Sequence, residues 1–219
     1  MNERVQAIVS KLIKNILDVC QEYQVTEGEL LKAIDFLTRI GQHDQFHLLS
    51  DLLGISVAVD DITYKSTYKG ATENNVEGPM YRPGAPLMNS PGHLCPQYHS
   101  GEPLFLSGRV LSAEDGRPIP RAYEIGKVGP IRELRDAMGW HGWRPAHIHF
   151  KVSAENHRPV TTQLYFEGDP WLDSDAIGAV KKSLVLKLTK HEDPKEWQEK
   201  GVNRAFYTTS YDFVLVPSK

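Results

Sequence analysis

Residues 3–61 carry apolar positions at helical spacing. Between residues 3 and 23 the apolar positions recur every three or four residues, which predicts an amphipathic helix with one broad apolar stripe. The members of this stripe are Val5, Ile8, Val9, Leu12, Ile16, Val19 and Tyr23. Thr26 and Glu29 have the spacing of a capping box and predict the start of a second helix, which ends near Gly41. A third helix is expected over residues 44–61. Three helices of this size bury too little apolar surface alone, so they require a partner surface.

After residue 70 the pattern changes to that of loops and strands. Six prolines lie between residues 79 and 103, which predicts a long ordered loop rather than a regular element. Apolar or alternating segments at 104–111, 143–152, 160–166, 184–188 and 206–216 predict strands. Short helices are expected over residues 130–138 and around 174–182. The chain is therefore expected to be α+β, with its helices first.

Composition excludes several classes of protein. The chain has 219 residues, a net charge of −3 and 40% hydrophobic residues, as expected for a globular protein. Its Lys and Arg residues are scattered, so the sequence gives no reason to expect a nucleic-acid partner. It has neither a signal peptide nor an apolar run long enough to span a membrane, so we expect the protein in the cytoplasm.

The stretch Trp143-Arg144-Pro145-Ala146-His147-Ile148-His149 carries the clearest candidate chemistry. A strand repeats every two residues, so His147 and His149 are expected on one face. Two imidazoles side by side on a rigid strand provide half of a metal site. The alternative interpretation is a pair of hydrogen-bonded histidines on a half-buried strand. Arg144 adds a fixed cation three residues before the pair.

Longer motifs connect this stretch to a known family. The sequence Gly-Pro-(x)8-Gly-x-His-x-x-Arg-Pro-Ala-His-Ile-His, from Gly129 to His149, resembles the intradiol ring-cleaving dioxygenases of the catechol and hydroxyquinol 1,2-dioxygenase group. The resemblance includes residues 77–86 and 167–173 and extends over nearly the whole chain. It implies a helical dimerisation region at residues 1–65, whose apolar tunnel can hold phospholipid. It also implies a β-sandwich catalytic domain at residues 66–219.

The resemblance also implies the residues of the site. Fe(III) is expected to be held by Tyr123, His147 and His149, and Tyr123 matches the tyrosine that leaves the iron and takes a substrate proton. Arg144 would stabilise negative charge on the ring, and Gln163 matches a polar residue beside the ligands. The substrate pocket is expected to be lined by Val76, Pro79 and Tyr81.

This sequence departs from the family's pattern near residues 118–122. Family members carry a long segment there, which supplies several strands of the sandwich and a second tyrosine ligand. Here Asp115-Gly116-Arg117-Pro118 leads almost directly to Tyr123. Tyr81, Tyr165 and Tyr207 are alternatives for the second ligand, and their spacing favours none of them.

Three functions follow from the resemblance. The first is cleavage of catechol by O2 to cis,cis-muconate, in a homodimeric enzyme with an internally shortened domain. The second is a hydroxyquinol 1,2-dioxygenase that gives maleylacetate. The third is an inactive remnant that dimerises and binds lipid through its helices.

Overall fold

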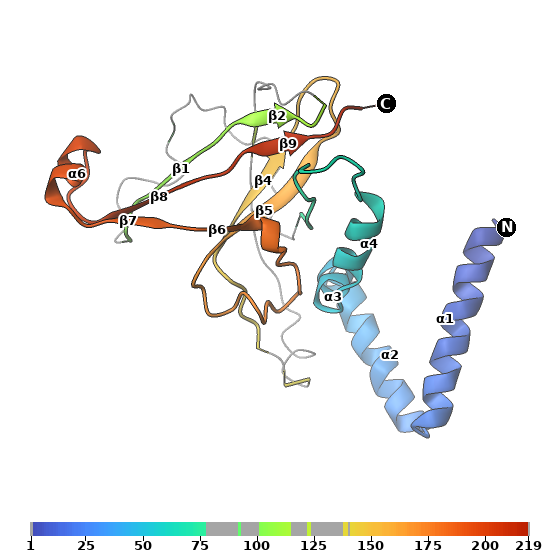
Figure 1. Ribbon diagram of the computed structural model, residues 1–219. Coiled ribbons are helices and arrows are strands. Elements are labelled where there is room, and N and C mark those ends of the chain that lie inside the picture. Colours follow the sequence, from blue (N-terminus) through green and yellow to red (C-terminus); the bar gives the residue numbers. More distant parts are fainter. Residues whose placement is uncertain are drawn as a thin grey trace. The chain divides into compact units, whose positions relative to one another are not determined.

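The structure is a computed structural model (Figure 1). It describes residues 2–77, 92, 101–114, 138–139 and 141–218, together with the backbone of 122–123. The chain forms two compact units, Met1–Phe46 and His47–Lys219. The functional division expected between residues 65 and 66 stays a prediction.

The first unit contains two helices, α1 (Glu3–Glu22) and α2 (Glu27–Gln42), which diverge from the turn between them (Figure 1). Asn2 caps α1, because its side chain accepts a hydrogen bond from the backbone N–H of Arg4. The predicted capping box of α2 is confirmed: Glu29 accepts from the Thr26 backbone, and its own N–H donates to the Thr26 hydroxyl. No residue of α1 is buried within the chain.

The helix predicted over residues 44–61 is two helices, α3 (Phe46–Leu52) and α4 (Ile55–Thr63). Gly54 separates them with a backbone φ of 69°, in the left-handed region that glycine adopts readily. Its N–H donates to the carbonyl of Asp51, which closes the end of α3. The prediction of one continuous helix was wrong, because the apolar period continues across this break.

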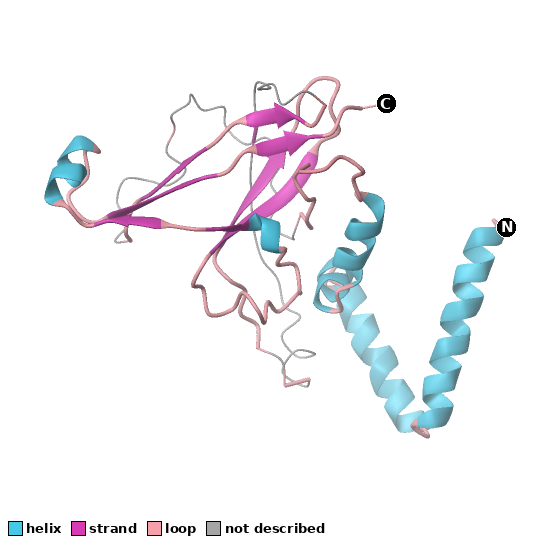
Figure 2. Cartoon of the chain, in the orientation of Figure 1, coloured by secondary structure: helices cyan, strands magenta, loops and turns pink. Residues whose placement is uncertain are grey.

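The described residues of the second unit form three sheets, and Figure 2 shows their strands in magenta. One has the order β1 (Leu104–Ser107), β8 (Phe206–Ser210), β7 (Thr189–His191). Another pairs β2 (Val110–Ser112) with β9 (Phe213–Leu215) in parallel. The largest has the order β3 (Ala122–Tyr123), β4 (His147–Val152), β5 (Val160–Phe166), β6 (Val185–Leu186). A 3₁₀ turn, η1 (Lys182–Leu184), precedes β6, and a short helix, α6 (Pro194–Glu199), follows β7.

Two predicted strands are each divided by a local feature. The segment 104–111 separates into β1 and β2 at Gly108, and the segment 206–216 separates into β8 and β9 opposite it. A Cβ atom on Gly108 would lie 1.8 Å from the carbonyl oxygen of Tyr211. Only glycine permits this close approach of two backbones.

The helix predicted around residues 174–182 is a turn, so this prediction was wrong. The Asp175 carboxylate accepts hydrogen bonds from the backbone N–H groups of Ile177 and Ala179. Gly178 has a φ of 64° and donates to the Asp175 carbonyl. An aspartate that bonds the following N–H groups favours a turn over a helix. The helix expected over residues 130–138 lies almost wholly outside the described residues.

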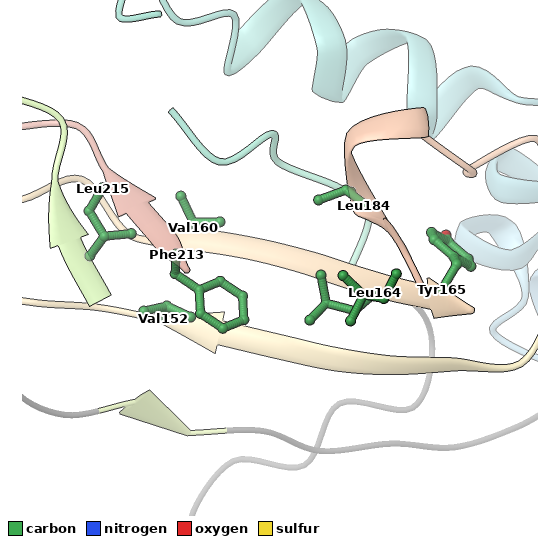
Figure 3. Packing of buried hydrophobic residues seen from close by; sticks show 8 residues of the cluster. Val152, Val160, Leu164, Tyr165, Leu184, Phe213 and Leu215 are labelled. Atoms are coloured by element: carbon green, nitrogen blue, oxygen red, sulfur yellow. The ribbon is translucent and has the colours of Figure 1, made fainter. Parts of the chain in front are cut away.

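The core of the second unit lies along β4, β5 and β9 (Figure 3). Its buried members are Val152, Val160, Leu164, Tyr165, Leu184, Leu186, Phe213 and Leu215. Four consecutive residues of β5, 162–165, are buried. Because successive side chains of a strand point to opposite faces, this strand is covered on both faces. Each fully buried aliphatic side chain stabilises the fold by about 1.5–3 kcal/mol.

The fold is α+β, as predicted: a helical N-terminal region precedes a sheet-rich domain. Among the described residues each sheet has two to four strands and none closes into a barrel. This is the arrangement expected of a β-sandwich domain that lacks several central strands.

Candidate metal centre

Strand β4 carries the histidine pair, and its antiparallel neighbour β5 fixes the surroundings of the pair. In the register of the two strands His147 lies opposite Tyr165, and His149 lies opposite Gln163. The two imidazole rings are 5.0 Å apart between centroids. The structure therefore brings the two histidines together on one side of the strand.

Both imidazoles are neutral at neutral pH. Burial lowers the pKa of His147, and the nearby Arg144 cation lowers it further. Burial also lowers the pKa of His149, to about 4, with additional contributions from His147 and Arg144. Because a metal ion binds only the neutral form of imidazole, the pair is already in the state that coordination requires.

The hydrogen bonds around the two rings suit a metal ligand pair. His147 Nδ1 lies 2.7 Å from the carbonyl oxygen of Pro145. Since a carbonyl only accepts, Nδ1 carries the proton and Nε2 keeps its lone pair. His149 Nδ1 is buried and has no hydrogen-bond partner in the described part of the chain. A metal ion would satisfy His149 Nδ1, and at His147 it would take the Nε2 lone pair in place of the hydrogen bond from Arg144 Nη1. On these terms the residues fit the ion that the sequence implies.

The two histidines do not make a complete site by themselves. Among the described residues no group of three His, Cys, Asp or Glu side chains could hold a metal ion. The predicted third ligand, Tyr123, is on β3, and its backbone pairs with Lys151, two residues from His149. The register therefore brings Tyr123 beside the histidine strand, while its side chain lies outside the described part.

Arg144 lies at the centre of a polar network beside the pair. Its Nε and Nη2 atoms donate to the two carboxylate oxygens of Asp175, at 2.8 and 3.0 Å. Nη2 also lies 2.9 Å from Gln163 Oε1 and 3.1 Å from the Tyr165 hydroxyl. The remaining nitrogen, Nη1, is 3.1 Å from His147 Nε2. Burial lowers the pKa of Arg144, but its bonds to Asp175 outweigh burial and raise that pKa overall.

The structure describes two more of the residues predicted around the metal ligands and the substrate, and two others lie outside the described part. Gln163 is fully buried, and its amide nitrogen donates to the carbonyl of Val76 at 2.8 Å. Val76 is also buried, and its N–H donates to Asn75. The structure thus brings Val76 beside Gln163. Pro79 and Tyr81, the other expected lining residues, lie outside the described residues.

Two of the alternatives for a second tyrosine ligand can be located. Tyr165 is fully buried, and burial raises its pKa to about 12, although Arg144 acts in the opposite direction. It is therefore a neutral phenol at neutral pH. Tyr207 is on β8 in a different sheet, opposite Leu104 and Lys190. Tyr165 lies beside His147, with ring centroids 5.8 Å apart, whereas Tyr207 belongs to a sheet that does not contain the histidines.

Sequence reasoning missed Asp175 and Asn75. The Asp175 side chain is 2% exposed and is 31 residues from its partner Arg144. Asn75 bonds the Ala179 carbonyl at 2.7 Å and the Tyr165 hydroxyl at 3.4 Å. Asp175 follows Asp169 and Asp173 in the sequence, and no local pattern distinguishes the buried carboxylate from its neighbours.

Comparisons with known proteins identify the family of this chain. The family model described as "Catechol dioxygenase N terminus" matches residues 2–71, and the model described as "Dioxygenase" matches residues 119–217. A hydroxyquinol 1,2-dioxygenase of Rhizobium sp. is 31% identical, covering 97% of this chain and 89% of its own. A chlorocatechol 1,2-dioxygenase of Rhodococcus opacus is also 31% identical, covering 90% and 95%.

Solved structures show the same relationship. The crystal structure of 3-chlorocatechol 1,2-dioxygenase from Rhodococcus opacus 1CP has a TM-score of 0.84 at 27% identity, with both chains fully covered. This chain therefore belongs to the intradiol ring-cleavage dioxygenase family, a family of oxidoreductases that act on aromatic diols with O2.

The alignments agree with the shortened catalytic domain. The comparison with the Rhizobium protein extends over 264 residues, although this chain has 219. Segments of that relative therefore have no counterpart in this chain. Within the described residues no helix is long and apolar enough to cross a membrane.

Proposed function

We propose that this protein is an iron(III)-dependent intradiol dioxygenase that cleaves catechol with O2 to give cis,cis-muconate. The observation that carries this proposal is the neutral pair His147 and His149 beside the anchored guanidinium of Arg144. A neutral imidazole pair with a nearby cation suits a metal-bound, negatively charged substrate. Membership of the family supports the class of reaction.

Three residues would hold the metal. His147 and His149 would supply imidazole nitrogen, and Tyr123 would supply an anionic oxygen, the type of ligand that a hard ferric ion prefers. Iron bound there would supply the Lewis acidity that binds a catechol through both oxygens and makes its ring reactive toward O2. Tyr123, whose backbone lies beside β4, would also accept a proton from the substrate as its phenolate leaves the metal.

Arg144 and Gln163 would place a positive charge beside the substrate, and the remaining predicted residues would form the wall of its pocket. Arg144 Nη1 faces His147 Nε2 at 3.1 Å, so the guanidinium would lie close to a bound diol and stabilise negative charge on its ring. Gln163 joins Arg144 to the Val76 carbonyl through its amide. Val76 would form the inner wall of the substrate pocket, and Pro79 and Tyr81 would continue that wall.

The test is ring cleavage by the purified, iron-loaded protein. We expect catechol to be converted to cis,cis-muconate, with one O2 consumed per product, as measured by ultraviolet absorbance and an oxygen electrode. His147→Ala should abolish iron binding and turnover, because it removes one of two imidazole ligands. The exposed His47 provides the control, and His47→Ala should behave as wild type. Full iron retention in His147→Ala would contradict the proposed site.

A hydroxyquinol 1,2-dioxygenase activity is the second candidate. The Rhizobium relative that acts on hydroxyquinol is as similar, at 31% identity, as the Rhodococcus relative that acts on chlorocatechol. We therefore propose parallel assays with catechol, chlorocatechol and hydroxyquinol. A higher kcat/KM for hydroxyquinol than for catechol, with maleylacetate as product, would identify hydroxyquinol as the preferred substrate.

We also propose that the protein is a homodimer and that it lies in the cytoplasm; the apolar stripe on α1 supports the dimer. The stripe on α1 is between 46 and 61% exposed over Val5 to Val19 and has no buried member. Apolar surface of this extent is stabilised by a partner, and we propose a second copy of this chain, with phospholipid between the copies. A dimer without iron or turnover would favour the third function, a remnant of the family that dimerises and binds lipid.

A further inference from the structure

One edge of the Arg144 guanidinium is fixed by a buried carboxylate. Asp175 accepts from Nε through Oδ1 and from Nη2 through Oδ2, which is the bidentate geometry that makes arginine pairs directional. The side chain of Arg144 is 20% exposed and that of Asp175 is 2% exposed. The pair is therefore screened little by water.

The carboxylate is itself held by the backbone. Its Oδ2 atom accepts from the N–H of Ala179 at 2.9 Å, and Oδ1 lies 3.5 Å from the N–H of Ile177. The turn is closed by Gly178, whose N–H donates to the Asp175 carbonyl at 2.9 Å. Asn75 then bonds the Ala179 carbonyl from the other side. Asp175 therefore has one orientation, and Arg144 takes its own orientation from it.

From this geometry we propose that Asp175 is a positioning residue for the ring-cleavage reaction. It fixes the Nε–Nη2 edge of Arg144, so that only Nη1 is directed toward His147 and the place of the substrate. A charge that is already oriented stabilises developing negative charge without reorganisation during the reaction. The inference rests on the proposed function, because it assigns Asp175 an effect that Arg144 transmits to the substrate.

The first test is a kinetic comparison of variants. Asp175→Asn keeps the size of the side chain but removes its charge and one acceptor. We expect kcat to fall about 100-fold, the scale of a misplaced catalytic group, with a smaller change in KM and with iron content unchanged. Asp175→Glu keeps the charge and should recover part of kcat. Asp173→Asn is the matched control, because Asp173 is exposed in the same segment and should leave kcat unchanged.

A double-mutant cycle separates positioning from a general structural role. If Asp175 acts through Arg144, adding Asp175→Asn to Arg144→Ala should lower kcat no further than Arg144→Ala alone. An equal additional loss in that background would overturn the proposal, and so would wild-type kcat in Asp175→Asn. Should Asp175→Asn fail to fold, Asp175→Glu takes its place in the same cycle, where the longer side chain displaces the guanidinium.

A second readout does not depend on activity. In metal-free protein labelled with ¹⁵N, we expect a slowly exchanging Nε–H signal from Arg144, which exchanges faster in Asp175→Asn and is unchanged in Asp173→Asn. An unchanged signal in Asp175→Asn would overturn the proposal. Absence of ring cleavage by the wild type would instead refute the proposed function, and the Nε–H signal would still decide whether Asp175 fixes Arg144.

Discussion

Replacing Tyr165 by phenylalanine tests whether this tyrosine is a structural phenol or a second ligand of the metal. Its hydroxyl lies 2.9 Å from Gln163 Oε1 and 3.2 Å from the Ala179 carbonyl, and it is also approached by Arg144 and Asn75. Burial raises its pKa from 10.0 to about 12, which adds about 3 kcal/mol to the free energy of deprotonation. In the metal-free protein this phenol therefore stays protonated at neutral pH.

The expected loss of stability is small, because each hydrogen-bond partner of the Tyr165 hydroxyl keeps another hydrogen bond. Without the hydroxyl, Gln163 Oε1 still accepts from Arg144, and the Ala179 carbonyl still accepts from Asn75. No buried group is left without a partner, so Tyr165→Phe should lower the free energy of unfolding by only about 1–2 kcal/mol, the net value of the lost hydrogen bonds. The neighbouring Leu164→Ala, which leaves a cavity in the core, should cost about 2–5 kcal/mol.

The assay is urea unfolding of the metal-free variants, followed by iron content and the visible spectrum of the loaded proteins. Tyr165→Phe should retain full iron and any tyrosinate absorption of the wild type. Loss of iron or of that absorption would refute the reasoning and would identify Tyr165 as a ligand. A loss of stability above about 4 kcal/mol would refute the hydrogen-bond argument, because it exceeds the net value of these bonds.

Three further predictions concern the fold, pH and assembly. Gly108→Ala should lower the free energy of unfolding by at least about 2 kcal/mol, because its Cβ would meet the Tyr211 carbonyl oxygen, and unchanged urea unfolding would contradict this. In metal-free protein, stability should decrease as the pH falls from 6.5 toward 4, because the unfolded chain protonates His149 before the folded chain does. His149→Ala should flatten that part of the stability–pH curve, and an identical curve would contradict the assignment. Leu12→Lys, in the exposed stripe of α1, should shift the protein from dimer to monomer in light scattering, whereas Gln21→Lys, on the opposite face of the same helix, should not; an unchanged dimer would exclude this face.

Local patterns predicted much of the secondary structure. The capping box of Thr26 and Glu29 located the start of α2, because both hydrogen bonds form within one turn of the chain. The apolar segments at 143–152 and 160–166 located β4 and β5, because a strand directs successive side chains to opposite faces and so leaves a local pattern. The break at Gly54 was missed, since glycine within an apolar helical period does not by itself show which backbone region it adopts.

The candidate site was predictable only in part. The motif around His147 and the resemblance it carries led to Arg144 and Gln163, and the structure brings all three together. The role of Asp175 depends on a turn that folds back onto Arg144 from a distant part of the sequence, and no period or spacing encodes that contact. The high pKa of Tyr165 likewise depends on burial between segments that are far apart in the chain.

We propose that His147, His149 and Tyr123 form a working ferric site in spite of the shortened domain. The most direct measurement is the iron content of the purified protein together with its visible absorption spectrum, before and after catechol is added without oxygen. We predict stoichiometric iron and a ferric tyrosinate band that shifts when catechol binds. Colourless protein that takes up no iron when it is supplied would contradict the claim.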